Sequence, residues 1–325
     1  MTQSNPQQDL EQLQKHLQEL IIGQEHLINC MLIALLADGH LLVEGAPGLA
    51  KTTAIKALAQ CIEGDFHRIQ FTPDLLPADL TGTEVFRPQT ADFKFQQGPL
   101  FHNLILADEI NRAPAKVQSA LLEAMAEHQV TIGRSTYALP KLFMVMATQN
   151  PIEQEGTYPL PEAQLDRFLL YVKIDYPDSS AEKRILALAR QQAEQGQQSS
   201  PSSLHELSQD TIESARKQVL TTYLGDNVEE YIVQLVIATR QPQRYDDQLA
   251  KHIRYGASPR ATIALDRCAR AHAWLAGRDY VSPEDVQTIA KDVLRHRLLL
   301  TFEAEADGLS SDDVIDQLLN IVPVP

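Results

Sequence analysis

A loop of small residues that ends in a lysine and a threonine has the composition of a phosphate-binding site. It reads GAPGLAKT from Gly45 to Thr52, after an apolar run at 41–44 and before a helical pattern that continues to about Ile62. In a strand, loop and helix of this kind, loop N–H groups and the positive helix end hold phosphate oxygens. Lys51 would reach the β and γ oxygens of a nucleotide, and Thr52 would bind Mg²⁺. The sequence therefore predicts a magnesium nucleotide site, although this motif alone also fits a chance Gly/Pro turn before a helix.

Alanine stands immediately before the lysine of this loop, where the usual pattern has glycine. A positive φ at Ala50 would cost roughly 1–2 kcal/mol for a residue with a Cβ atom. A helical φ at the start of the helix would cost nothing. We expect the helical φ, which makes the substitution harmless.

Two carboxylates, Asp108 and Glu109, end a second apolar run at 104–107. At the carboxyl end of a parallel strand, Asp108 can hold the Mg²⁺ shell, and Glu109 can polarise a water for attack on the γ-phosphate. An acidic pair is otherwise a solvated start of a loop. Because buried apolar runs rarely end in two carboxylates by chance, we favour the catalytic interpretation.

Short apolar runs alternate with helical patterns from residue 41 to about residue 176. This alternation predicts a parallel sheet flanked by helices. Before the sheet, residues 8–36 are expected to form a helix, a turn at Gly23 and a second helix. The expected strands are 41–44, 68–71, 103–108, 142–148 and 169–174.

No strand is expected after Pro177, where a helical region begins. Residues 179–182 (SSAE) are typical of a capping box at the start of a helix, and residues 191–209 of a surface loop. Helical patterns then continue to about Leu300. Two of these helices should begin at Ser-Pro pairs, with Ser258 and Ser282 as the caps.

The composition excludes several classes of protein. With 28 Lys+Arg against 43 Asp+Glu, the 325-residue chain carries a formal charge of −15, which disfavours a nucleic-acid partner. Three widely spaced cysteines, Cys30, Cys61 and Cys268, form neither a disulfide framework nor a zinc pattern. The chain starts without a basic and apolar leader, and its longest apolar stretch, 27–37, is interrupted by Asn29. We expect a cytoplasmic protein that does not span a membrane.

Several further segments resemble the AAA+ ATPases, and within them the MoxR family. Together they cover most of residues 20–175, and a short match at 258–261 extends the resemblance toward the C-terminus. The segments are 45–52 with its Ala50 variant, 70–82 (QFTPDLLPADLTG), 106–114 (LADEINRAP), 147–156 (ATQNPIEQEG) and 161–168 (PEAQLDRF).

This resemblance implies an α/β P-loop core and a separate lid. The core, residues 1–177, would hold a parallel five-stranded sheet flanked by helices, and residues 178–325 would form an all-helical lid domain. The stretch at about 73–98 resembles the helix-2 insert of the family's clade, and 129–139 resembles its hairpin before the sensor 1 residue. Both would project into the pore of a ring.

The resemblance also gives roles to single polar residues. Asn150 matches sensor 1, which helps to align the attacking water, although an asparagine before Pro151 also suits a plain turn. Arg167 resembles the arginine finger that reaches the γ-phosphate of a neighbouring subunit; the alternative is an arginine paired with Asp166 or Glu162. Arg260 matches sensor 2 of the lid. Its position in the first turn of a helix is unfavourable for a cation, and the alternative is a surface salt bridge.

The remaining expected nucleotide contacts surround the loop. Residues 21–24 (IIGQ), which include Ile22 and Gly23, resemble the segment that lines the adenine pocket, but apolar residues before a glycine turn are as often plain core. The nucleotide-binding residues implied in total are Gly45, Ala46, Pro47, Gly48, Leu49, Ala50, Lys51, Thr52, Thr53, Ile22, Gly23 and Arg260.

For a MoxR-type protein the implied function is ATP hydrolysis by a homo-oligomeric ring with Mg²⁺ as cofactor. The ring would be a hexamer that remodels or activates partner proteins as a chaperone, commonly proteins with von Willebrand factor A domains. Two alternatives are open: a motor driven by nucleic acid, and a switch or scaffold in which ATP binding alone matters. Net charge argues against the first, and Glu109 against the second.

Overall fold

The computed structural model of the chain describes residues 5–151, 156–195 and 206–325. Residues 152–155 of one resembling segment, and most of the surface loop expected at 191–209, therefore lie outside the described residues. By its contacts the chain forms two compact units. The first comprises Met1–Leu32, His40–Leu160 and Val172–Glu213, and the second Ile33–Gly39, Pro161–Tyr171 and Ser214–Pro325. Each unit draws on several parts of the chain, so the division into 1–177 and 178–325 stays a prediction.

A parallel five-stranded sheet forms the centre of the α/β fold, as the sequence predicts. Its strand order is β2-β5-β8-β1-β9. The first strand has the expected bounds, and the others begin or end within two residues of them. The strands are β1 (Leu41–Glu44), β2 (Phe66–Gln70), β5 (Leu104–Asp108), β8 (Met144–Gln149) and β9 (Leu170–Lys173).

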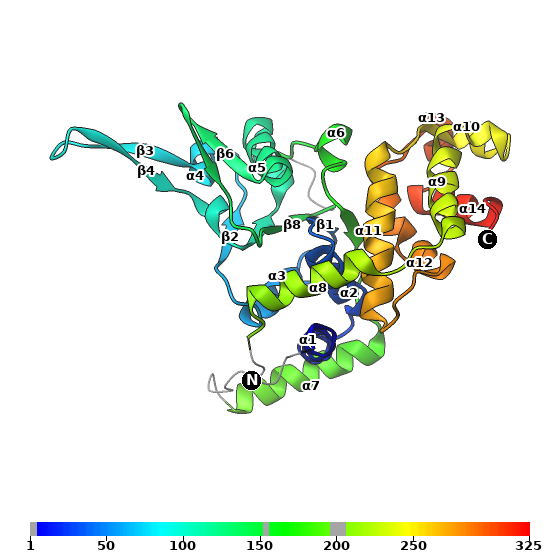
Figure 1. Cartoon of the computed structure of the whole chain (residues 1–325), viewed down its shortest axis with the longest axis horizontal. Coiled ribbons are helices and arrows are strands. Elements are labelled where there is room, and N and C mark those ends of the chain that lie inside the picture. Colours follow the sequence, from blue (N-terminus) through cyan, green and yellow to red (C-terminus); the bar gives the residue numbers. More distant parts are fainter. Residues whose placement is uncertain (1–4, 152–155, 196–205) are drawn as a thin grey trace. The chain divides into compact units, whose positions relative to one another are not determined.

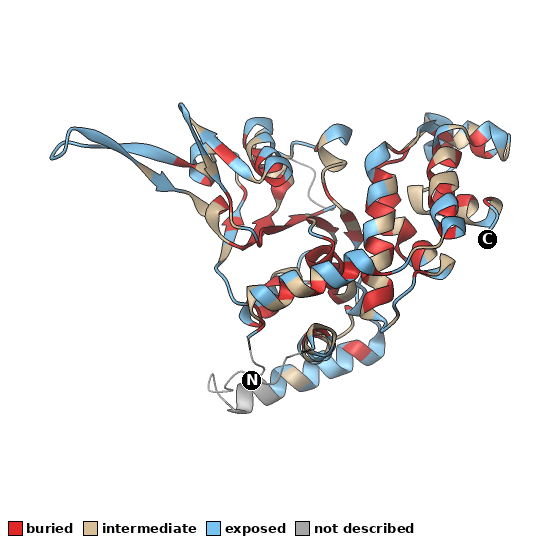
Figure 2. Ribbon diagram, viewed as in Figure 1, coloured by how far each residue is buried: buried red, intermediate tan, exposed pale blue. Residues whose placement is uncertain are grey.

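The central strands are apolar along their length because both faces of the sheet are covered. Every residue of β5 is buried, and so is every residue of β8 except Gln149. Parallel strands buried on both faces have near-continuous apolar sequences for this reason. Figure 2 shows these strands as the buried centre of the fold.

Helices and two hairpins complete the first part of the chain (Figure 1). Its helices are α1 (Pro6–Leu20), α2 (Glu25–Leu36), α3 (Lys51–Gln60), α4 (Pro77–Thr81), α5 (Ala115–Glu127) and α7 (Ser179–Gln195), with short 3₁₀ turns η1 (Pro99–Phe101) and η2 (Ile110–Arg112). The capping box expected at 179–182 would make Ser179 the cap of α7, and this is wrong. The cap of α7 is Asp178, whose Oδ1 accepts from the N–H of Ala181 at 2.7 Å and of Ser180 at 3.0 Å.

The stretch that resembles the helix-2 insert forms α4 and a hairpin of β3 (Gly82–Arg87) and β4 (Asp92–Gln97). The hairpin extends away from the sheet and is mostly exposed (Figures 1 and 2). Two glycines form its base. A Cβ atom on Gly82 would lie 2.2 Å from the carbonyl oxygen of Gln96, and one on Gly98 would lie 2.3 Å from that of Leu80. The base therefore admits no larger residue at either position.

A second hairpin, β6 (Gln129–Ile132) and β7 (Ser135–Ala138), lies where the sequence predicts a hairpin at 129–139. An aromatic stack joins it to the insert, because the rings of Phe95 and Tyr137 lie 4.1 Å apart. The Phe95 ring also contacts that of Phe101 edge-on at 5.6 Å. The two hairpins are thus packed together through aromatic side chains.

The second unit is largely helical, and its helices continue beyond Leu300, where the sequence patterns end. Ser258 and Ser282 cap two of these helices, as expected. A short antiparallel pair, β10 (Ile253–Tyr255) and β11 (Leu299–Leu300), is a departure from the all-helical expectation. The remaining elements are α6 (Glu162–Leu165), α8 (Gln209–Thr221), α9 (Asp226–Arg240), η4 (Pro242–Arg244), α10 (Leu249–His252), α11 (Pro259–Leu275), α12 (Pro283–Leu294), α13 (Phe302–Ala306) and α14 (Ser311–Ile321).

Within the parts of the chain that the structure describes, no helix combines the length and the hydrophobicity that crossing a membrane requires.

A buried carboxylate fixes the start of α12. Asp285 is 1% exposed and accepts hydrogen bonds from Arg278, His272 and Ser282. Burial alone would raise the pKa of Asp285, but the hydrogen bonds from Arg278, His272 and Ser282 outweigh it and hold the pKa well below its usual range. The ionised form of Asp285 therefore stabilises this unit.

Asp285→Asn should lower the free energy of unfolding at pH 7 by about 3–5 kcal/mol, because it leaves a partly buried guanidinium without its partner. The unfolded pKa of aspartate is about 3.9, and folding lowers it. The contribution is therefore present above that pH and is lost as pH falls toward the folded-state pKa. Urea unfolding followed through Trp274, the one tryptophan of the chain, should give a smaller difference at pH 3 than at pH 7. An equal difference at both values would contradict this assignment.

The control is Asp316→Asn, which removes a half-exposed partner of Lys291 in the same unit. Exposed ion pairs contribute about 0–1 kcal/mol, so this variant should unfold close to the unsubstituted protein.

Candidate nucleotide site

The two glycines of the predicted phosphate loop are required for different structural reasons. A Cβ atom on Gly45 would lie 2.4 Å from the side chain of Ile174, so only glycine fits there. Gly48 has open space around it but adopts φ +87°, a conformation that side chains rarely adopt. Helix α3 begins at Lys51, directly after this loop.

Ala50 contradicts the expectation of a helical φ. Its φ is 57° and its ψ 12°, in the left-handed region, where a residue with a Cβ atom is strained by roughly 1–2 kcal/mol. Left-handed residues in a loop turn successive N–H groups toward one side, and such concave arrangements bind anions. The strain at Ala50 therefore lies in the loop that the sequence predicts to bind phosphate, and strained residues are common at functional sites.

Lys51 lies in the first turn of α3 and folds back over the loop. Its Nζ donates to the carbonyl oxygen of Gly45 at 2.6 Å and faces that of Gln149 at 3.4 Å. Burial lowers the pKa of Lys51, and the nearby carboxylates of Asp108, Glu109 and Glu44 oppose this shift. The ammonium group is thus held among the carboxyl ends of the central strands.

Asp108 ends β5 and is held on both oxygens. Its Oδ1 accepts from the Thr148 hydroxyl at 2.6 Å, and its Oδ2 accepts from Arg68 Nε at 3.1 Å and Nη2 at 2.5 Å. Sequence reasoning assigned no role to Thr148 or Arg68. A polar threonine inside the buried run of β8 was an available signal for the first.

Glu109 follows with a left-handed backbone of φ 57° and ψ 51°. Its N–H donates to the Thr148 hydroxyl at 2.9 Å, and its Oε2 lies 3.0 Å from both Gln70 Nε2 and Arg112 Nε. Gln70 belongs to a segment of the resemblance, but neither it nor Arg112 was predicted to touch Glu109. These two donors set the direction of the carboxylate.

The edge where β1, β5 and β8 end collects the predicted catalytic groups other than Arg167. Pairing is parallel between β1 and β8 and between β5 and β8, so their carboxyl ends share one edge. Asn150 is buried directly after β8, and Thr52 follows Lys51 in α3. Cations, carboxylates and an amide therefore meet beside one phosphate loop.

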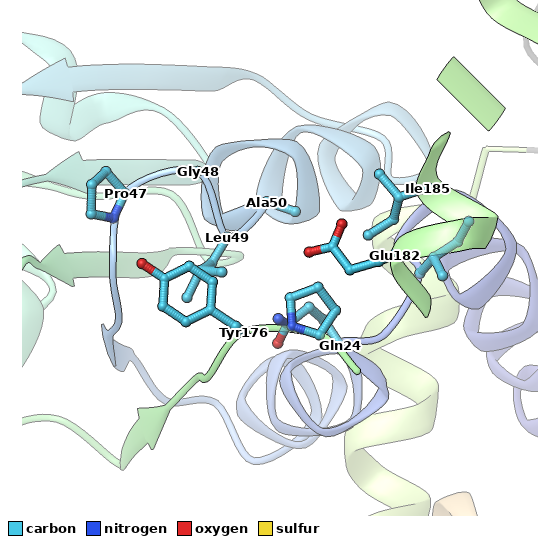
Figure 3. A pocket seen from close by; sticks show the side chains of 10 residues that line it. Gln24, Pro47, Gly48, Leu49, Ala50, Tyr176, Glu182 and Ile185 are labelled. Atoms are coloured by element: carbon cyan, nitrogen blue, oxygen red, sulfur yellow. The ribbon is translucent and has the colours of Figure 1, made fainter. Parts of the chain in front are cut away.

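A cavity of about 230 Å³ adjoins the loop. Ile22 lines it, as expected, whereas Gly23 forms the adjoining turn with φ +77°. A Cβ atom on Gly23 would lie 2.9 Å from that of Ala181. Figure 3 shows the Glu182 carboxylate pointing toward the middle of the cavity. Gln24 and the loop residues 47–50 also line it, as expected. Sequence reasoning missed the remaining lining residues, which are Tyr176, Pro177, Glu182 and Ile185.

Arg167 and Arg260 belong to the second unit. The sequence predicts that Arg167 serves a neighbouring subunit and that Arg260 acts from the lid. Arg167 follows α6, and Arg260 lies in the first turn of α11. The Arg260 side chain is 54% exposed, and its Nη1 lies 3.7 Å from Asp166 Oδ2. This is the salt bridge that the alternative interpretation of Arg260 requires, although its length and exposure make it weak.

Comparisons with known proteins show which family the chain resembles. Residues 40–170 match the family model described as "ATPase family associated with various cellular activities (AAA)", and residues 248–318 match the AAA lid domain. A crystal structure from Cytophaga hutchinsonii of a protein assigned as an ATPase superimposes with a TM-score of 0.90 at 44% identity. The match covers 98% of this chain and 96% of that one.

Curated relatives match along most of their length. The chain is 45% identical to Chaperone MoxR1 of Mycobacterium tuberculosis, over 94% of this chain and 80% of that protein. It is 42% identical to YeaC of Bacillus subtilis, over 96% and 93%. It is 33% identical to the protein MoxR of Paracoccus denitrificans, over 94% and 93%.

Ala50→Gly should raise the free energy of unfolding by up to about 1.6 kcal/mol. Removing the Cβ atom relieves roughly 1–2 kcal/mol of left-handed strain, and the more flexible unfolded chain offsets about 0.4–1 kcal/mol of that gain. Thermal unfolding followed by circular dichroism measures the change. Gly48→Ala is the matched control and should shift the melting temperature in the opposite direction. A lower melting temperature for Ala50→Gly would contradict the strain.

Proposed function

The chain belongs to the MoxR family of AAA ATPases, and on that premise we propose that it forms a homo-oligomeric ring that hydrolyses Mg·ATP to remodel partner proteins. One observation carries the chemical part of the proposal. Lys51, Asp108, Glu109 and Asn150 end or follow adjacent strands beside a phosphate loop and a cavity.

The nucleotide would lie along the loop with its base in the cavity. Loop N–H groups from Gly45 to Thr53 would hold the phosphates together with the positive end of α3. Lys51 would exchange the carbonyl oxygens it now contacts for phosphate oxygens. Adenine would pack between Ile22 and Tyr176, whose ring is 70% exposed and can cover it.

The residues present fit a magnesium ion. Mg²⁺ prefers oxygen ligands and is usually held by one or two carboxylates plus substrate phosphates. Thr52 and Asp108 offer a hydroxyl and a carboxylate, and the Thr148 hydroxyl orients Asp108. When bound, the ion would neutralise charge on the phosphate oxygens.

Hydrolysis would use Glu109 and Asn150. The Glu109 carboxylate would polarise a water whose oxygen attacks the γ-phosphorus while the bond to the bridging oxygen of ADP breaks, and Asn150 would align that water. In this structure, contacts with Gln70 and Arg112 hold the Glu109 carboxylate by its Oε2 atom. For the Glu109 carboxylate to turn toward the water, these contacts must weaken. Because Gln70 is the last residue of β2, hydrolysis would then be coupled to the end of that strand.

Arg167 and Arg260 would complete the site from two directions. Arg260 would touch the nucleotide of its own chain as the lid residue of sensor 2. Arg167 would reach the γ-phosphate bound to a neighbouring chain, and such a finger contributes about 10³–10⁵ in rate. This role requires an oligomer. We propose that the oligomer is a hexamer, as the resemblance to MoxR-type proteins implies.

The energy of hydrolysis would be used on protein partners in the cytoplasm. MoxR1 is named a chaperone, and proteins with von Willebrand factor A domains are the partners that the resemblance implies. The β3–β4 hairpin offers apolar contacts for such partners, because Phe86 is 50% exposed and Phe93 is 66% exposed. A net charge of −15 disfavours nucleic acid as the partner.

Mixing two inactive variants tests the shared site. Glu109→Gln should bind ATP but hydrolyse it at least about 100-fold more slowly, because it lacks the polarising carboxylate, and Arg167→Ala should also be inactive. Their mixture should regain part of the ATPase rate, since intact sites form where one chain supplies Glu109 and the other Arg167. Phosphate release at several mixing ratios measures this. No recovery at any ratio would remove the shared site.

Tyr176→Ala should raise KM for ATP about 10-fold with little change in kcat, because stacking of a base on an aromatic ring contributes roughly 1–3 kcal/mol. Steady-state kinetics measures both constants. Tyr223→Ala is the matched control, since Tyr223 is 67% exposed and lies outside the lining of the cavity. Equal KM values for the two variants would place the base elsewhere.

A further inference from the structure

Asp166 stands immediately before Arg167, and three side chains from the lid share its carboxylate. Arg297 Nε donates to Oδ1 at 2.8 Å, and Ser258 Oγ donates to Oδ2 at 2.8 Å. Arg260 Nη1 lies 3.7 Å from Oδ2. The carboxylate is largely buried, at 16% exposure. All these residues belong to the second unit.

Arg297 ties the backbone around Arg167 to the lid. Its side chain is 2% exposed, and besides Asp166 it donates to the carbonyl oxygens of Phe168 at 2.6 Å and Leu169 at 3.2 Å. Burial lowers the pKa of Arg297, and its hydrogen bond to Asp166 opposes the shift. A buried guanidinium with so many partners cannot move without leaving a charge uncompensated. Arg297 therefore attaches the backbone on both sides of Arg167 to the lid.

The two residues before Arg297 continue this attachment. His296 Nε2 lies 3.1 Å from the carbonyl oxygen of Phe168, and Arg295 Nη1 donates to that of Tyr171 at 2.6 Å. Burial holds the pKa of His296 well below its usual range, so the ring is neutral and its Nε2–H is the donor. Three consecutive lid residues thus bind one short stretch of backbone.

Ser258 connects the same carboxylate to Arg260. Its hydroxyl donates to Asp166 and also accepts from the N–H of Arg260 at 3.1 Å, as the cap of α11. A shift of the first turn of α11 therefore displaces the hydroxyl from Asp166. The ion pair of Arg260 with Asp166 is longer and more exposed than the pair with Arg297, so it is the contact that a phosphate would displace first.

We propose that Asp166 is a positioning residue that couples Arg260 to Arg167 through the hydroxyl of Ser258. The inference rests on the proposed function, in which Arg260 reads the nucleotide of its own chain and Arg167 serves the neighbour. Binding of nucleotide at one site then changes how well the same chain supplies Arg167 to the next site. The coupling lies within one chain and needs no contact between subunits other than Arg167 itself.

The test places the substitution in the chain that only supplies Arg167. In the mixture of Glu109→Gln and Arg167→Ala chains, the Glu109→Gln chain hydrolyses nothing at its own site, so the recovered rate reports on its Arg167. Ser258→Gly in that chain removes the hydroxyl, while glycine remains acceptable as a helix cap. The recovered rate should fall about 3- to 10-fold, because small errors in position strongly reduce catalysis. Ser258→Thr, which keeps the hydroxyl, should restore it.

Ser282→Gly in the same chain is the matched control, since Ser282 caps α12 and donates to Asp285 rather than to Asp166. Melting temperatures of the Ser258 and Ser282 variants must agree within a few degrees, and Asp166→Asn serves as a second variant if they do not. Recovery by Ser258→Gly equal to that by Ser282→Gly would overturn the coupling alone. If the Glu109→Gln and Arg167→Ala chains recover no activity even without a substitution at Ser258 or Ser282, the shared site is overturned, and the coupling with it.

Discussion

The hydrogen bond between the Thr148 hydroxyl and Asp108 joins the two central strands at the edge where the reactive groups must lie. The same hydroxyl accepts from the N–H of Glu109, so a single threonine holds the Asp108 carboxylate and the backbone of Glu109. This arrangement depends on register. Leu104 pairs with Met144 and Ala107 with Ala147, and a slip of one residue would turn Thr148 to the other face of the sheet.

Burial keeps this register in place. The strands on both sides of the Asp108–Thr148 bond are apolar on both faces, and the helices that cover them exclude water. A carboxylate at the end of such a strand is stabilised only where donors reach it, which Arg68 and Thr148 do. The candidate site is therefore a product of the sheet, and the loop before α3 adds the backbone that we propose holds phosphate.

Much of this fold followed from the sequence because period and composition report directly on burial. The apolar runs predicted five strands to within two residues, and Ser-Pro pairs predicted the starts of α11 and α12. The contact of Gln70 with Glu109 could not be predicted, since Gln70 reaches it from β2, whereas Arg112 lies three residues after Glu109 and its spacing was an available signal. The φ of Ala50 was predicted wrongly because the preference of alanine for helical φ is weaker than the geometry that the loop imposes. Glu182 and Tyr176 escaped notice because nothing in their local sequence marks a cavity.

The two glycines at the base of the β3–β4 hairpin set how this protein can diversify. Gly82 and Gly98 approach backbone atoms so closely that neither tolerates a Cβ atom, while the strands beyond them are exposed and carry little of the core. Mutations in the strands therefore cost little folding energy, whereas mutations at the base would displace the hairpin. Such a separation lets the exposed strands change in sequence over evolutionary time while the attachment of the hairpin to the ATPase core stays the same.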